Sequence, residues 1–135
     1  MLAKTKLARN VFHMKTVAVI GASNNRAKFG NKAVRAFHQT GYKVYPIHPA
    51  HSEVEGLPCY KTIQELPERP NLVSVYIGPE QLLKVLPDIA LKSCDELWLN
   101  PGTESAEVLK RAKQLGLKTV ETCSILALGI SPSSL

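Results

Sequence analysis

The chain has 135 residues, a length that suits one domain with a single hydrophobic core and leaves no room for a second. Hydrophobic residues make up 44% and charged residues 21%, which argues against a disordered or fibrous protein. No apolar run approaches the roughly 20 residues of a membrane span, and the start lacks the apolar stretch of a signal peptide. We therefore expect a cytoplasmic protein that does not bind membranes.

The net charge of +6 is distributed unevenly along the chain. Residues 1–52 contain nine lysines or arginines and no acidic residue, whereas all eleven acidic residues follow. Such asymmetry indicates a polyanionic partner, which could be nucleic acid, an anionic membrane surface or a phosphorylated small molecule. The three cysteines are widely spaced and form no C-x-x-C motif, so we expect reduced thiols and no metal site.

The first part of the chain predicts two strands separated by a helix. A β-branched apolar run at 17–20 is typical of a strand that is buried on both faces. Phe29, Ala33 and Phe37 then recur at helical spacing, which predicts a helix with these three residues in its buried stripe. Apolar residues at 44–47 predict the second strand.

The rest of the chain continues this alternation. It predicts a short helix near 62–66, a strand at 72–77, a helix over 82–90, a strand at 97–99, a helix capped by Thr103 or Ser105, and a strand at 118–123. Pro87 removes a backbone donor within the second of these helices, so we expect a kink or a restart there. Residues 131–135 are expected to fray.

Five strands that alternate with helices, joined by connections too long for hairpins, predict an α/β fold. Its doubly wound, five-stranded parallel sheet would be covered on both faces, giving three layers, α/β/α. In such a sheet the ligand lies at the carboxyl ends of the strands. The candidate site therefore consists of the residues after each strand, at 21–30, 46–49, 77–79, 100–103 and 122–124.

The loop after the first strand has the composition of an anion site. Gly21 permits a tight turn, the small and polar residues at 22–25 leave backbone N–H groups exposed, and the following helix begins with a partial positive charge. Arg26 and Lys28 add two cations with no acidic residue in the same segment. These features favour phosphate binding over a plain polar surface turn.

A nicotinamide or flavin dinucleotide enzyme is one alternative. Its G-x-G-x-x-G fingerprint needs glycines where Ser23 and Arg26 stand, and it needs a carboxylate at the end of the second strand, where His48 stands. A cofactor with more phosphate than NAD is therefore favoured over an NAD(P)-binding oxidoreductase-like domain. The other alternative is a basic nucleic-acid-binding protein, against which stand the absence of a reader motif and the 6% aromatic content.

Four segments at these strand ends resemble the stand-alone CoA-binding domain family and, more distantly, the amino-terminal domain of the succinyl-CoA synthetase α subunit. The segments are 17–23, 41–49, 100–104 and 121–123. The resemblance implies a Rossmann-like domain over residues 15–128, between an extension at 1–14 and a tail at 129–135. It also implies coenzyme A, or an acyl-CoA, as the bound cofactor.

The resemblance further implies which residues hold the cofactor. The phosphate-holding loop of the synthetase matches Gly21, Ala22, Ser23, Asn24, Asn25 and Arg26. A lysine that begins the second strand matches Lys43, which we expect near the adenylate, and the turns after later strands match Ile77, Asn100 and Pro101. Cys123 is either a small buried residue or a thiol that forms a mixed disulfide with CoA.

No catalytic residue is predicted. The titratable groups near the strand ends, His48, Glu104, Glu121 and Cys123, match neither a Ser–His–Asp nor a paired-carboxylate pattern. The resemblance does not include the phosphohistidine domain of the synthetase, so it implies no ligase activity. We therefore expect a small CoA-binding protein with a non-catalytic or regulatory role.

Overall fold

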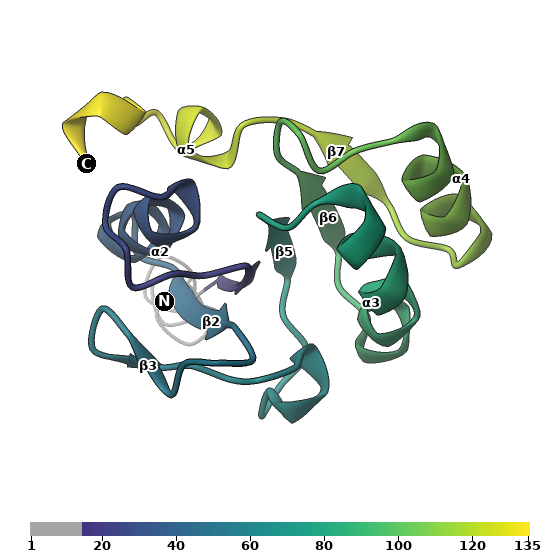
Figure 1. The fold of residues 1–135 in the computed structure, drawn as a ribbon, viewed down its shortest axis with the longest axis horizontal. Coiled ribbons are helices and arrows are strands. Elements are labelled where there is room, and N and C mark those ends of the chain that lie inside the picture. Colours follow the sequence, from purple (N-terminus) through teal and green to yellow (C-terminus); the bar gives the residue numbers. More distant parts are fainter. Residues whose placement is uncertain (1–14) are drawn as a thin grey trace, which may run out of the picture.

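A parallel sheet of five strands forms the centre of the molecule in the computed structural model, which describes residues 15–135 (Figure 1). The strands are β1 (Thr16–Ile20), β2 (Lys43–Ile47), β5 (Leu72–Val75), β6 (Glu96–Leu99) and β7 (Thr119–Glu121). Their order is β2-β1-β5-β6-β7, so the chain reverses direction across the sheet between β1 and β5. All five predicted strands are confirmed, as is the doubly wound parallel sheet. Among the described residues, no helix is long and apolar enough to cross a membrane.

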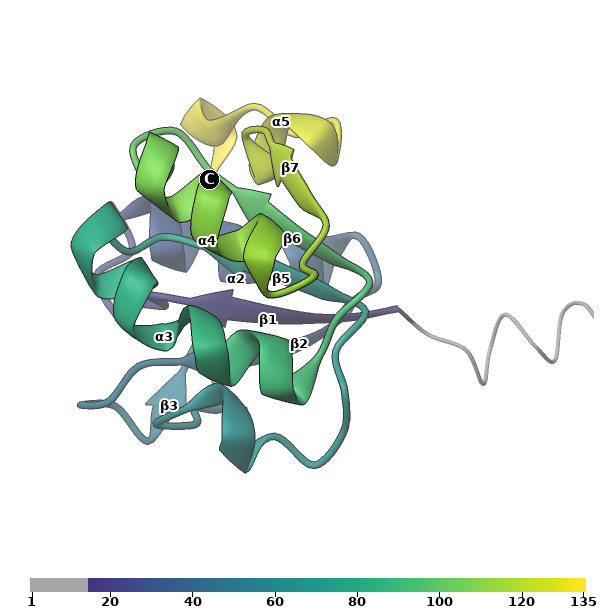
Figure 2. The same ribbon diagram turned by 90° about the vertical axis from the view of Figure 1, so that its right-hand side faces the viewer.

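Helices cover both faces of this sheet (Figures 1 and 2). They are α2 (Phe29–Gln39), α3 (Pro79–Lys92), α4 (Ala106–Gln114) and α5 (Ser124–Ala127). Side chains of β1 alternate between the faces: Val17 and Val19 belong to one apolar cluster with α2, and Ala18 and Ile20 to another with α3. These two clusters confirm the three-layer architecture.

Two expectations about the helices differ from the structure. Helix α3 runs without interruption through Pro87, so the expected restart is wrong, whereas the alternative of a kink stays a prediction. The expectation that Phe29 is buried is wrong, because its side chain is 54% exposed. Phe29 is the first residue of α2, and helical side chains lean toward the N-terminus, so its ring extends past the end of the sheet. Of the two candidate caps of α4, Ser105 accepts the hydrogen bond, from the Val108 N–H at 3.1 Å.

The connection between β2 and β5 contains a hairpin that the sequence did not predict. Its strands, β3 (Glu53–Val54) and β4 (Leu57–Pro58), are antiparallel. Glu55 and Gly56 between them have φ values of 51° and 77°, as a two-residue turn with φ > 0 at both central positions requires. Such turns favour Asn-Gly or Asp-Gly, so the Glu-Gly pair gave no clear signal. The predicted short helix follows as η1 (Ile63–Glu65).

The C-terminal residues are ordered against the domain. The expectation that 131–135 fray is wrong, because η2 (Pro132–Ser134) forms a 3₁₀ turn there. Lys32 on α2 donates a hydrogen bond to the Pro132 carbonyl at 3.1 Å, and Leu135 packs against the cluster beneath α2. The predicted extension at 1–14 lies outside the described residues.

Candidate functional site

The turn between β1 and α2 brings the start of a helix unusually close to the end of a strand. Gly21 has a φ of 90°, and a Cβ there would lie 2.6 Å from the Tyr76 carbonyl oxygen. A Cβ on Gly30 would lie 2.1 Å from the carbonyl oxygen of Gly21. The N–H groups of Gly21 and Ala22 both donate to the Ile47 carbonyl, which fixes this turn to the end of β2. Both glycines are therefore required for the turn to close.

A cavity of about 840 Å³ opens beside this turn, at the carboxyl ends of β1, β2 and β5. Its lining comes from residues 20–23, 28–30, 47–49, 61–63 and 76–78 and from Gln81, Lys84, Val85 and Asp88 of α3. The cavity thus lies where the order of the strands reverses, which is where doubly wound sheets bind ligands. Its volume is within the range of small-molecule and cofactor sites.

Cations dominate the charged lining of the cavity. Lys28, Lys61 and Lys84 line it, and none of them forms an ion pair within residues 15–135. Asp88 is the single carboxylate of the lining. Burial, together with the nearby charges of His51 and Lys28, lowers the pKa of His48, so that its imidazole is neutral at pH 7. This balance of charge suits an anionic ligand.

Among the described residues, His48 and His51 are not joined by a third residue that could complete a metal site. Their ring centroids are 4.2 Å apart, and His48 Nδ1 accepts a hydrogen bond from the Ala50 N–H at 3.0 Å. In the part of the chain that the structure describes, no group of three or more histidines, cysteines or acidic residues is placed to hold a metal ion. The pair instead forms one side of the turn after β2.

The loop at 23–26 is held in place by its own side chains. Ser23 Oγ accepts a hydrogen bond from the Asn25 N–H, and Asn25 Oδ1 accepts one from the Ala27 N–H, both at 3.0 Å. Asn24 donates from its side chain to the Glu53 carbonyl of the β3–β4 hairpin at 3.1 Å. Ser23 lines the cavity, whereas Asn24 and Asn25 lie outside its lining.

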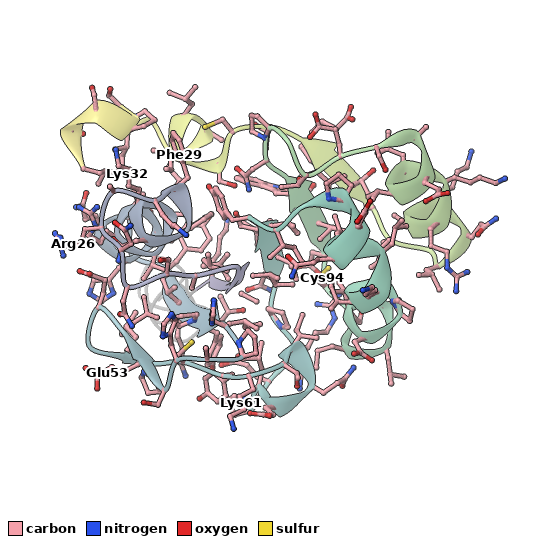
Figure 3. All side chains as sticks on the ribbon, in the orientation of Figure 1. Arg26, Phe29, Lys32, Glu53, Lys61 and Cys94 are labelled. Carbon is pink, nitrogen blue, oxygen red and sulfur yellow. The ribbon has the colours of Figure 1, made fainter. Side chains whose placement is uncertain are left out.

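The hairpin also brings a carboxylate to Arg26. The two side chains form an ion pair of 2.5 Å between Arg26 Nη1 and Glu55 Oε1, and Asn31 donates to the same carboxylate at 3.1 Å. The hydrogen bond from Asn31, followed by that from Arg26, lowers the pKa of Glu55. The loop, whose sequence segment contains no acidic residue, therefore has an acidic neighbour in three dimensions. Arg26 is exposed (Figure 3) and does not line the cavity.

Asn100 lies beneath the site rather than in it. It is 2% exposed, and its side chain donates to Ser74 Oγ at 3.0 Å and to the Val75 carbonyl at 2.9 Å. Its Oδ1 accepts from the Ser124 N–H at 2.8 Å, and the hydroxyls of Ser74 and Ser124 are 2.8 Å apart. This buried network joins the ends of β5 and β6 to the start of α5. Sequence reasoning missed Ser74 and Ser124, since each lies alone among apolar neighbours.

Tyr76 connects this network to the cavity. Tyr76 lines the cavity, and its hydroxyl is buried without a hydrogen-bond partner among residues 15–135. Burial raises the pKa of Tyr76 to about 12. A charged phenolate is therefore unfavourable at this position.

The structure brings together only part of the predicted site. Gly21, Ala22, Ser23 and Ile77 all line the cavity, whereas Pro101 is an exposed residue outside it. Cys123 precedes α5 and is half-buried against the cluster beneath α2, also outside the lining. Its mixed disulfide with CoA stays a prediction.

Lys43 lies at the opposite edge of the sheet. It is the first residue of β2, paired in register with Thr16, whereas Ile47 at the other end of β2 lines the cavity. At the rise of a strand these two residues are about 13 Å apart. Lys43 Nζ lies 3.4 Å from a carboxylate oxygen of Glu68 and 5.4 Å from the ring centre of Tyr45. The structure therefore does not bring Lys43 to the other predicted site residues.

Sequence reasoning also missed one wall of the cavity. Lys61 and Thr62 lie in the connection after the unpredicted hairpin, and the α3 residues Gln81, Lys84, Val85 and Asp88 follow one another at i, i+3, i+4 and i+7. That spacing places the four α3 residues on a single helix face. The spacing was visible in the sequence, but its role depends on how α3 docks beside the end of β5.

Comparison with known proteins assigns most of the chain to one family. The family model described as a CoA binding domain matches residues 15–129. Acetate–CoA ligase [ADP-forming] I of Archaeoglobus fulgidus is 28% identical over 120 residues, which are 82% of this chain and 18% of the ligase. The chain thus spans less than a fifth of the length of this relative.

Proteins of similar size match over most of their length. Protein YneT of Bacillus subtilis is 22% identical over 114 residues, which are 84% of each chain. A solved structure of a conserved hypothetical protein from Pyrococcus furiosus superimposes with a TM-score of 0.79 at 30% identity, and the match covers 84% of this chain and 99% of that one. The fold described above is therefore also found as a stand-alone protein.

Proposed function

Because the chain belongs to the family of CoA-binding domains, we propose that it binds coenzyme A or an acyl-CoA in the cavity at the carboxyl edge of the sheet. The observation that carries the proposal is the combination of the tight turn between Gly21 and Gly30 with three lysines that have no acidic partner in the described residues. Backbone N–H groups at a helix start and nearby ammonium groups are a typical site for a pyrophosphate.

Polar and apolar residues of the cavity contact different parts of CoA in this proposal. Ser23, Lys28 and the start of α2 bind the pyrophosphate of CoA, because the Gly21 and Ala22 N–H groups already donate to Ile47. Ile47 and Ile77 supply apolar surface for its adenine or pantetheine. Arg26 adds positive potential beside the turn between β1 and α2. Its guanidinium has five N–H donors, so it retains donors for a phosphate beyond the one that contacts Glu55.

We propose binding or regulation, rather than catalysis, as the role of this site. The lining contains one carboxylate, Asp88, and one neutral imidazole, His48, and it has no paired carboxylates. General acid–base catalysis at a CoA thioester or carboxyl group uses such groups in matched positions. The relatives that are ligases are several times longer than this chain, and their activity belongs to those proteins.

Calorimetry with CoA, acetyl-CoA, NAD, NADP and ATP tests the proposal. We expect CoA and acetyl-CoA to bind, and Lys28→Ala to weaken CoA binding more at low than at physiological salt, because screening reduces the contribution of an exposed charge. Lys110→Ala, which changes a lysine on α4 outside the cavity lining, is the matched control. Binding of NADP without binding of CoA would contradict the proposal.

A further inference from the structure

The cavity continues from one helical layer to the other. Lys28 and Phe29 line it at the start of α2, which packs on one face of the sheet. The segment at 61–63 and α3 line it on the opposite face, where Ile63 and Leu82 share a cluster. In Figure 3 the labelled side chains of Phe29 and Lys61 accordingly lie on opposite sides of the strand ends.

Two lysines, Lys61 and Lys84, line the α3 side of the cavity. Gln64 of η1 donates to the Asp88 carbonyl at 2.7 Å, and Lys92 donates to the Leu66 carbonyl at 2.6 Å, so η1 and α3 run side by side in the same direction. Lys61 precedes Gln64 by three residues, and Lys84 precedes Asp88 by one helical turn. If the two segments continue side by side toward the carboxyl edge, Lys61 lies beside the turn of α3 that contains Lys84. Both residues line the cavity, which confirms that they face the same space.

These two ammonium groups have no acidic partner that cancels their charge. Neither Lys61 nor Lys84 forms an ion pair within residues 15–135, and Asp88 is the single carboxylate that lines the cavity with them. Two like charges on one wall repel each other unless an anion lies between them. The wall is also separate from Ser23, Lys28 and the start of α2, which bind a different part of the ligand.

We propose that Lys61 and Lys84 form a second anion subsite, which binds a terminal phosphate monoester of the ligand while the start of α2 binds its pyrophosphate. This inference rests on the proposed function, because in CoA the group in question is the 3′-phosphate of the ribose. The subsite makes the protein selective for CoA over dephospho-CoA, which has the same pyrophosphate, adenine and pantetheine but lacks the monoester. Selectivity then comes from two lysines that lie beside η1 and on α3, not from the loop at 21–26.

The affinities of CoA and dephospho-CoA for the wild-type protein, Lys61→Ala and Lys84→Ala test the subsite. We expect the wild type to bind CoA about tenfold more tightly, as one charge-assisted phosphate contact allows. Each substitution should weaken CoA binding and leave dephospho-CoA binding unchanged, so that the ratio of the two affinities falls toward one. Lys110→Ala, on α4, should keep the wild-type ratio.

The outcomes separate this inference from the proposed function. Equal wild-type affinities for the two ligands, or substitutions that weaken both ligands by the same factor, would overturn the subsite while CoA binding stands. A wild type that binds neither ligand would overturn the proposed function and the subsite with it. Thermal unfolding of each variant checks that the fold is intact, which we expect because Lys61 and Lys84 are both exposed.

Discussion

The two edges of the sheet differ in how their charges are paired. At the amino edge, where the strands begin, three ion pairs lie side by side: Lys43–Glu68 at 3.4 Å, Arg69–Asp95 at 2.9 Å and Lys118–Glu96 at 3.2 Å. At the carboxyl edge, the three lysines of the cavity have no such partner among the described residues. Within residues 15–135, the carboxyl edge therefore offers a ligand three lysines in one cavity that are not paired with acidic residues.

This difference shows why a count of cations along the sequence is a poor guide to a binding site. A hydrogen bond from Arg69 lowers the pKa of Asp95, and one from Trp98, assisted by Lys118, lowers the pKa of Glu96. These carboxylates already form ion pairs with the cations beside them. A phosphate that approached the amino edge would have to displace them, whereas at the carboxyl edge it meets ammonium groups without acidic partners.

Gly30→Ala should disrupt the turn between β1 and α2 at the carboxyl edge and have the largest effect on stability and CoA binding. The new Cβ would lie 2.1 Å from the carbonyl oxygen of Gly21, and backbone on both sides of the contact must move. We expect a loss of about 3 kcal/mol in the free energy of unfolding, measured with urea, together with a loss of CoA binding. Gly78→Ala is the matched control, because a Cβ added there would meet no atom within 4 Å and its φ is −68°. It should lower the free energy of unfolding by less than about 1 kcal/mol. Equal losses in the free energy of unfolding in the two variants would refute the close-approach argument.

Asn100→Ala should destabilise the same edge by removing buried hydrogen bonds beneath the cavity. The substitution leaves the Ser124 N–H, the Val75 carbonyl and the Ser74 hydroxyl short of a buried partner. Each unsatisfied buried group is costly, so we expect a loss of about 3 kcal/mol in urea unfolding. Asn24→Ala removes one exposed hydrogen bond and should cost less than about 1 kcal/mol. A small effect at Asn100 would show that water replaces the network.

Tyr76→Phe should show how strongly the protein around Tyr76, at the carboxyl edge, excludes water. The pKa of Tyr76 is raised from 10.0 to about 12, so the unfolded chain loses its phenolic proton first and stability falls as pH rises from about 10 to about 12. The phenylalanine variant lacks this contribution and should retain about 2 kcal/mol more stability than the wild type near pH 12. This difference adds to one of about 1 kcal/mol at pH 7, because the variant removes a buried hydroxyl that has no hydrogen-bond partner among the described residues. Parallel stability curves over this pH range would disprove a buried neutral phenol.

The fold was predictable because its signals are local. The run at 17–20 is too apolar for an exposed strand, Gly21 ends it with a turn, and the same alternation of patterns repeats to the last strand. These features predict a parallel sheet and the edge at which the cavity is found. They also predict the turn at 21–23, which lines the cavity, without any knowledge of the packing.

The cavity was only partly predictable, because its far wall depends on tertiary contacts. Lys61 and Lys84 are separated by 23 positions in the sequence and line the same cavity only because η1 packs along α3. The partner of Arg26, Glu55, reaches it through a hairpin whose turn requires a positive φ at a glutamate, which residue preference does not predict. Lys43 is a different case: all parallel strands begin at one edge, so the predicted topology already placed this residue away from the carboxyl ends.

Lys43→Ala should therefore have the smallest effect, and the absence of an effect is informative. We expect unchanged CoA affinity by calorimetry at both low and physiological salt, because Lys43 lies at the amino edge beside Glu68 and outside the cavity lining. Lys28→Ala, measured in parallel, changes a lysine without an acidic partner among the described residues and should lose affinity most at low salt. If Lys43→Ala weakened CoA binding as much as Lys28→Ala, the adenylate would lie at the start of β2. The comparison between the two edges would then no longer explain where this protein binds its ligand.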